Sequence, residues 1–325
     1  MNNMRIGVHI ALQNIQMMGA PALIDGIVAA DRDGLDTAWL TVGGPAPDPF
    51  AVFVGAALSG AERITFGTSI VPTYPRHPIS MVQGAASVDQ LAPGRLILGL
   101  GPSHKPAIEG TWGIPFHKPL SHLREYVTVC RALLEEGQVN HEGELITARA
   151  QLPGGPTQVS TMISALREKA WSLSGEITAG GISWMSPLPY IRDVALPAQQ
   201  AGADLAGRDR PAMVVHTPII LSEDEDAIRS AAKRQFGFYQ RLPYYSQMLQ
   251  DAGYDEAAGT DFTDRMADAL IVSGSESEVG DRVRAMHDDY GVDELLAAIV
   301  VLEEDPESHI ARTRAFLGEL AQADQ

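Results

Sequence analysis

Residues 95–104 of the chain read Arg-Leu-Ile-Leu-Gly-Leu-Gly-Pro-Ser-His, an apolar run that ends in glycines, a serine and a histidine. Strands that are buried on both faces have this composition, which is typical of parallel sheets covered by helices. The glycines at the end of the run allow a ligand to approach the backbone closely. The stretch therefore predicts a buried parallel strand followed by a loop suited to binding.

Similar apolar runs recur on both sides of this stretch and alternate with helical patterns. We expect strands at residues 5–10, 37–42, 64–71, 95–100, 158–163, 181–185, 212–221 and 295–301. Between them, apolar residues are spaced three and four apart, as over 120–134, which indicates amphipathic helices. Eight strands in such an alternation favour one closed (β/α)8 barrel over residues 1–325, with an open doubly wound sheet as the alternative.

Two stretches interrupt the alternation. Residues 138–156 are polar and rich in glycine and proline, and they predict an insertion between the fourth helix and the fifth strand. Residues 235–262 are unusually aromatic and predict a second insertion, after the seventh strand.

Composition narrows the classes of function. Asp and Glu number 41 against 24 Lys and Arg, and the net charge of -17 disfavours binding to nucleic acid or to a membrane surface. A single cysteine, Cys130, excludes an internal disulfide, and no His or Cys spacing typical of a metal site occurs. With no secretory or membrane-spanning stretch, we expect a soluble, cytoplasmic enzyme without a metal that acts on a small molecule.

The active site of such a barrel lies where the strands end, so the residues there are the candidates. They include glycines, small hydroxyl residues, histidines and aromatic residues, among them His9, Thr41, Ser69, His77, Gly101, His104, Ser164, Trp184 and His216. Free backbone N–H groups at the start of the helix that contains Lys169 could hold a phosphate, although an ordinary loop is the alternative. A partly apolar pocket with anion donors on one side suits a flavin-like cofactor.

Specific strings then indicate a family. Residues 64–78, Ile-Thr-Phe-Gly-Thr-Ser-Ile-Val-Pro-Thr-Tyr-Pro-Arg-His-Pro, resemble strand three of the luciferase-like monooxygenase superfamily, in its coenzyme F420-dependent (deazaflavin) branch. Residues 96–104 with 109–113 resemble the strand-four loop of that branch, and 122–126 its next helix. Residues 238–249 resemble its aromatic insertion. The similarity runs from about Met4 to Val301.

The resemblance implies a bacterial-luciferase-like barrel, often a homodimer, that transfers a hydride between F420 and a small organic substrate. It implies a cis peptide bond between Ser69 and Ile70, and His104 as the residue that handles the proton. The cofactor would be bound by Thr41, Ser69, Ile70, Gly101, His104, Ser164, Ala165, Leu166 and Lys169. The substrate would be lined by His9, His77 and Trp184, with the aromatic insertion as a lid that excludes water.

The chain also departs from the family pattern. Residues 165–169 read Ala-Leu-Arg-Glu-Lys where the family has Ala-Leu-Gly-Pro-Arg, which places Glu168 where a phosphate would bind. The Asp-His pair that sugar-phosphate dehydrogenases of the superfamily carry after strand two is absent, and Thr41 and Val42 stand in that area. Two alternatives therefore stay open: an FMN-dependent two-component monooxygenase of the same fold, and a non-catalytic flavin-binding barrel.

Overall fold

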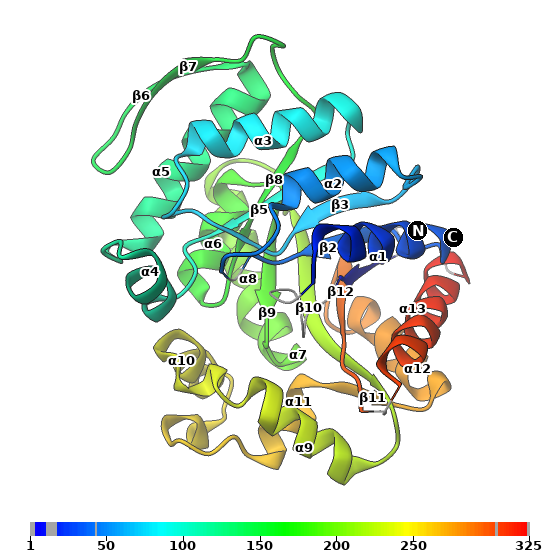
Figure 1. Ribbon diagram of the computed structural model, residues 1–325. Coiled ribbons are helices and arrows are strands. Elements are labelled where there is room, and N and C mark those ends of the chain that lie inside the picture. The colour runs from blue at the N-terminus through cyan, green and yellow to red at the C-terminus, as the bar shows by residue number, and fades with distance from the viewer. Residues whose placement is uncertain (1–3, 11–17, 43, 303–304, 324–325) are drawn as a thin grey trace.

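The structure, a computed structural model, describes residues 4–10, 18–42, 44–302 and 305–323. Eight parallel strands form a closed barrel surrounded by helices, as Figure 1 shows. In order around the barrel they are β1 (Arg5–His9), β2 (Thr37–Leu40), β3 (Thr65–Thr68), β5 (Leu96–Gly101), β8 (Ser160–Ser164), β9 (Gly180–Trp184), β10 (Ala212–Leu221) and β12 (Glu294–Ile299). The ring closes because β9 pairs with β10, while β10 pairs with β12 and β12 with β1. The barrel prediction is confirmed, and the open sheet is excluded.

The helices follow the strands, and their ends match the sequence rules. The described helices outside residues 235–262 are α1 (Ala20–Arg32), α2 (Pro49–Leu58), α3 (Pro78–Leu91), α4 (Lys105–Trp112), α5 (Pro119–Arg131), α6 (Glu168–Ile177), α7 (Leu188–Tyr190), α8 (Leu196–Leu205), α9 (Glu225–Phe236, which reaches into the insertion), α11 (Asp264–Leu270), α12 (Glu276–Asp288) and α13 (Pro306–Ala323). Asp48 accepts a hydrogen bond from Phe50 N–H and caps α2, which starts with Pro49. A π-helical turn, η1 (Ala132–Glu136), extends α5 and ends at Gly137, and a second, η2 (Ile191–Ala195), joins α7 to α8. None of the described helices has the length and apolar character needed to cross a membrane.

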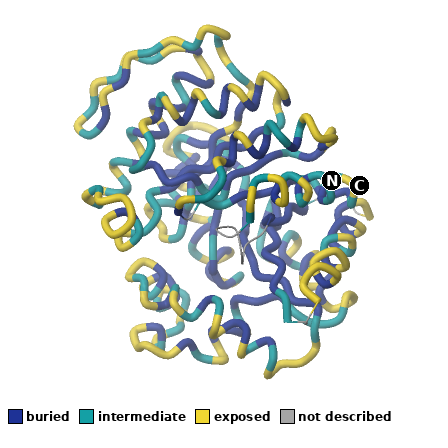
Figure 2. Tube along the Cα trace, in the orientation of Figure 1, coloured by how far each residue is buried: buried dark blue, intermediate teal, exposed yellow. Residues whose placement is uncertain are grey.

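The inside of the barrel is filled by one small cluster of side chains. Trp39, Ile97, Met162, Ile182, Val214 and Leu296 make up this inner cluster. Glycine is required around the Trp39 indole, since a Cβ added at Gly7 would lie 2.7 Å from Trp39 Nε1. Figure 2 shows the strands as the most deeply buried part of the chain, with the exposed residues on the outer helices and hairpin. The packed interior leaves the ends of the strands as the place for a site.

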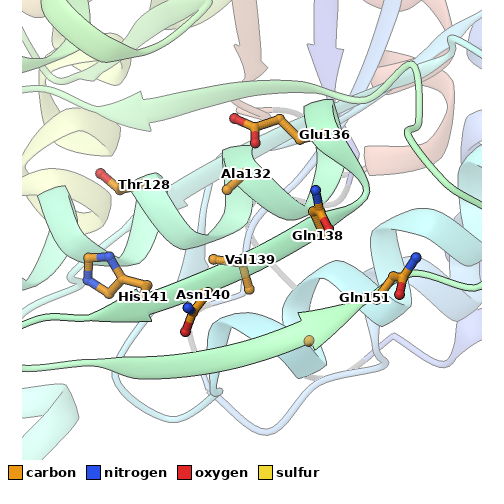
Figure 3. Close-up of a pocket in the computed structure, with 9 residues that line it drawn as sticks. Thr128, Ala132, Glu136, Gln138, Val139, Asn140, His141 and Gln151 are labelled. Carbon is orange, nitrogen blue, oxygen red and sulfur yellow. The ribbon is translucent and has the colours of Figure 1, made fainter.

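The first predicted insertion is a β-hairpin on the outside of the barrel. Its strands are β6 (Gln138–Glu142) and β7 (Thr147–Gln151), which among the described strands pair only with each other. Figure 1 shows the hairpin projecting beyond α5. Figure 3 shows a groove between the hairpin and α5, lined by polar and small apolar side chains of α5, η1 and the hairpin. The groove lies on the outside of the barrel wall, away from the carboxyl ends of the strands.

The second insertion, residues 235–262, forms a separate helical layer, here called the aromatic insertion. It comprises the single turns η3 (Tyr239–Arg241) and η4 (Asp255–Ala258) on either side of α10 (Pro243–Asp251). Together with α9 and α11 (Asp264–Leu270) it packs on a second apolar cluster that includes Met185 and Tyr190. The short strand β11 (Val272–Gly274) then returns the chain to the end of β10. The hairpin begins at Gln138, whereas residues 235 and 236 of the second insertion form the end of α9.

Candidate functional site

Eight inward-facing positions form a single layer at the carboxyl ends of the barrel strands. Side chains alternate between the two faces of a strand, so a residue two positions beyond an inward-facing one also faces inward. Each of these eight residues has such an inward-facing residue two positions before it. We call this set the mouth layer: His9, Thr41, Ser69, Gly101, Ser164, Trp184, His216 and Ala298. Six of them were predicted as cofactor-binding or substrate-lining residues, and the fold brings these six together.

The peptide bond between Ser69 and Ile70 is cis, as the resemblance implies. Neighbouring backbone holds it on both sides: Ser69 N–H donates to Leu40 O at 2.8 Å, and Val42 N–H donates to Ile70 O at 3.1 Å. The Thr41 hydroxyl donates to Ser69 O at 2.7 Å. The short strand β4 (Val71–Pro72) continues from this point and pairs with Leu100 and Gly101 of β5.

Gly101 lies close to Ile70 and Ser164. A Cβ added at Gly101 would lie 2.9 Å from Ile70 Cγ1 and closer still to Ser164 Oγ. No side chain fits there without displacing both neighbours. Ile70 lies between β3 and β4, Gly101 ends β5 and Ser164 ends β8. These three residues form a closely packed surface, here called the narrow wall, in which position 101 has no room for a side chain.

Histidines occupy the other side of the mouth layer. The rings of His9 and His216 stack with centroids 5.3 Å apart and planes 10° from parallel. The ring centroid of Trp184 lies 4.1 Å from that of His216. Both histidines are 4% exposed. Burial lowers the pKa of His9 from 6.5 to about 3, and burial followed by the proximity of His9 lowers that of His216 well below 6.5. Both imidazoles are therefore neutral at neutral pH.

His104, the predicted proton-handling residue, lies at the rim, in the position before α4. It is half-buried and does not cap the helix with its side chain. Its ring centroid lies 5.7 Å from that of Tyr245 and 6.4 Å from that of Tyr239, both in the aromatic insertion. Burial lowers the pKa of His104. The insertion thus reaches the predicted site, in keeping with the lid that the resemblance implies.

The predicted phosphate-binding segment is only partly suited to that role. Ala165 N–H is not free, because it donates to Ile182 O at 2.9 Å. Leu166 packs against the apolar cluster under the aromatic insertion, while Lys169 is exposed in the first turn of α6. Arg167 forms an ion pair with Asp251 of α10 at 3.2 Å. Ser164 is the predicted residue of this segment that faces the mouth layer.

Two further residues are placed differently from the sequence expectation. His77 is exposed and acts as the N-cap of α3, where its Nδ1 accepts a hydrogen bond from Ile79 N–H at 3.3 Å. The structure does not bring it into the mouth layer. His216 stood among the strand-end candidates but was given no role, and it lies at the centre of the stack with His9 and Trp184. Its position two residues beyond Val214, in a strand whose side chains alternate between two faces, could have indicated that it faces the mouth layer.

Comparisons with known proteins agree with this geometry. The chain is 28% identical over 293 residues to an F420-dependent glucose-6-phosphate dehydrogenase of Segniliparus rotundus, covering 84% of this chain and 86% of the relative. It is 26% identical over 287 residues to a 5,10-methylenetetrahydromethanopterin reductase of Methanolobus tindarius, covering 82% and 87%. The solved structure of the coenzyme F420-dependent tetrahydromethanopterin reductase of Methanopyrus kandleri superposes with a TM-score of 0.77 at 21% identity, over 98% of both chains.

These relatives are oxidoreductases, and they support an oxidoreductase activity for this chain. The model of the luciferase-like monooxygenase family matches residues 4–294. The chain therefore belongs to the luciferase-like monooxygenase family.

Proposed function

We propose that this protein is an F420-dependent oxidoreductase that transfers a hydride between the deazaflavin and a small organic substrate. The observation that carries the proposal is the narrow wall at Ile70, Gly101 and Ser164, where a Cβ at position 101 would collide with both neighbours, so that the wall can present backbone rather than a side chain at this position. Flat heterocycles need such close backbone approach. The name of the Segniliparus rotundus relative, an F420-dependent dehydrogenase, supports the choice of deazaflavin.

The residues of the mouth layer fit a planar, largely uncharged ring. Strand order places β3 and β5, which carry the narrow wall, across the barrel from β10 and β12. His216 on β10 thus lies across the barrel from that wall, and its ring contacts those of His9 and Trp184. The residues that would hold the cofactor are Thr41, Ser69, Ile70, Gly101 and Ser164.

The bound deazaflavin would supply the hydride chemistry, and the chain would supply orientation and a route for the proton. His104 is the proposed proton-handling residue. Since burial lowers its pKa, its imidazole is neutral at neutral pH and can accept a proton from a substrate. Tyr239 and Tyr245, which contact His104, would exclude water from the site.

Cofactor titration tests this proposal. Purified protein is titrated separately with F420 and with FMN, and binding is followed by the change in cofactor fluorescence. Tight binding of F420 alone supports the proposal. Binding of FMN alone would replace it with the FMN-dependent monooxygenase, and binding of neither would overturn both.

A variant at the narrow wall sharpens the test. We expect Gly101→Ala to weaken F420 binding about tenfold or more, because the methyl group would contact Ile70 and Ser164. Gly110→Ala is the matched control, since a Cβ at Gly110 of α4 meets nothing within 4 Å. Unchanged affinity in both variants would show that the cofactor does not lie against Gly101.

A further inference from the structure

The hydrogen bonds around Thr41 determine which nitrogen of His9 carries its proton. A threonine hydroxyl has one proton and two acceptor sites. Ser69 O is an acceptor only and lies 2.7 Å from Thr41 Oγ1, so the Thr41 proton lies between these two oxygens. His9 Nε2 also lies 2.7 Å from Thr41 Oγ1. The hydroxyl can only accept at this contact, so the proton there belongs to His9 Nε2.

The other nitrogen of His9 is then an unused acceptor. Burial keeps the ring neutral, and a neutral imidazole has a single N–H. With the proton on Nε2, Nδ1 carries only a lone pair. It is buried and has no hydrogen-bond partner among the described residues. A buried acceptor without a partner costs free energy, and a ligand that donates a hydrogen bond would recover it.

Among the residues that the structure describes, the mouth layer around His9 carries no charge that could hold an ion. His216, stacked on His9, is also neutral, and the remaining members of the mouth layer are Thr, Ser, Gly, Ala and Trp residues. An anionic or cationic group brought beside His9 would lose its hydration without gaining a counter-ion.

We propose that the site selects an uncharged substrate that donates a hydrogen bond through a hydroxyl or N–H group, and that His9 Nδ1 is the acceptor. Thr41 is the positioning residue that fixes the His9 tautomer. This inference rests on the proposed function, because it assigns the substrate side of the same site. It also separates this chain from a sugar-phosphate enzyme, whose substrate is an anion.

The tautomer is tested without cofactor or turnover. In protein labelled with 15N-histidine, two-bond 1H–15N correlation spectra distinguish a protonated from an unprotonated ring nitrogen. We expect His9 to have a protonated Nε2 and a bare Nδ1. Three probes of one shape are then titrated by calorimetry: cyclohexanol, a donor; cyclohexanone, an acceptor only; and cyclohexanecarboxylate, an anion. Cyclohexanol should bind about tenfold more tightly than the other two and shift the Nδ1 resonance of His9.

Variants separate recognition from folding. Thr41→Val removes the acceptor for His9 Nε2–H and should abolish the preference for cyclohexanol, whereas Thr41→Ser keeps the hydroxyl and should retain it. His9→Phe keeps a ring to stack on His216 but has no acceptor, and it should also lose the preference. Circular dichroism confirms that each variant is folded.

A His9 protonated on Nδ1, equal binding of the three probes, or no binding of any of them would overturn the inference. F420 binding, measured on the same samples, reports the proposed function separately. A protein that shows the expected tautomer and preference but does not bind F420 would contradict only the cofactor assignment.

Discussion

The buried imidazoles of His9 and His216 couple the stability of the barrel to pH. In the folded state their pKa values lie below 6.5, about 3 for His9, so the unfolded chain binds protons that the folded chain does not. Above pH 6.5 both histidines are neutral in the folded and the unfolded chain, so they do not make the free energy of unfolding depend on pH. This free energy falls as the pH decreases from 6.5 toward the pKa of the folded state. The slope is about 1.4 kcal/mol per pH unit for each such histidine.

We expect His9→Phe to flatten this dependence. Between pH 6.5 and 5 the variant should lose roughly 2 kcal/mol less unfolding free energy than the unmodified protein, because one histidine no longer takes part. Urea unfolding at the two pH values measures the difference. His117→Asn, a change at an exposed histidine, should leave the slope as it is. An unchanged slope in His9→Phe would contradict the neutral buried state of His9.

At the scale of residues, the sequence indicated positions at the strand ends, and the roles of these residues stay predictions. The strand-end rule and the family strings named six residues that the fold brings to one layer: His9, Thr41, Ser69, Gly101, Ser164 and Trp184. They could not show that Ala165 N–H donates a hydrogen bond to Ile182 O, since that bond depends on the register between β8 and β9. Nor could they show the His9 tautomer, which depends on where Thr41 Oγ1 lies relative to Ser69 O.

The hairpin β6–β7 depends on one carboxylate from α5. Glu125 accepts hydrogen bonds from the backbone N–H groups of Glu144, Leu145 and Ile146, which form the turn and the residue before β7. Although burial opposes it, these bonds and the nearby His141 lower the pKa of Glu125. The carboxylate thus stabilises the turn at neutral pH, and this contribution is lost as the pH falls below the ordinary range of a glutamate.

We expect Glu125→Gln to loosen the hairpin while the barrel stays folded. A neutral amide accepts these backbone hydrogen bonds less strongly than a carboxylate, so amide exchange over residues 143–147 should accelerate about tenfold. Hydrogen–deuterium exchange measures it. Glu142→Gln is the control, because Glu142 pairs only with exposed Arg149. Equal protection in both variants would show that Glu125 does not hold the turn.

At the scale of elements, the eight barrel strands were predictable because burial on both faces makes them apolar. The hairpin was predicted only as an insertion, since its strands alternate polar with small residues and derive their stability from a distant helix. The three-residue strand β11 is too short to show a pattern, and only its pairing with β10 defines it. In the helical layer of the aromatic insertion, Tyr245, Met248 and Leu249 belong to an apolar cluster with Met185 and Tyr190, residues distant in sequence that no local pattern identifies as their partners.

For the whole molecule, the prediction of a closed barrel is confirmed because the pattern that produced it extends over nearly the entire chain. Closure itself joins residues almost 290 positions apart, since Arg5 pairs in register with Glu294. The sequence could not show which side chains stabilise this contact. The homodimer and the cytoplasmic location stay predictions.

A buried carboxylate lies at the seam where the barrel closes. Glu294 of β12 is 3% exposed, accepts a hydrogen bond from Trp39 Nε1–H at 2.8 Å and lies 3.5 Å from Arg5 Nη1. Burial raises its pKa even though Arg5 and Trp39 oppose the shift. Because the folded carboxyl holds its proton at a higher pH than the unfolded one, its ionisation destabilises the fold as the pH rises above the ordinary range of a glutamate.

Two substitutions at this seam should therefore differ sharply. Glu294→Gln keeps the acceptor for Trp39 and removes the cost of burying a charge, so the free energy of unfolding at pH 7 should change by less than about 1 kcal/mol. Glu294→Ala leaves the Trp39 N–H unpaired beside a cavity and should lose about 2–4 kcal/mol. Chemical unfolding of both variants measures this. Equal losses would mean that the negative charge, rather than the hydrogen bond and the filled volume, stabilises the closure of the barrel.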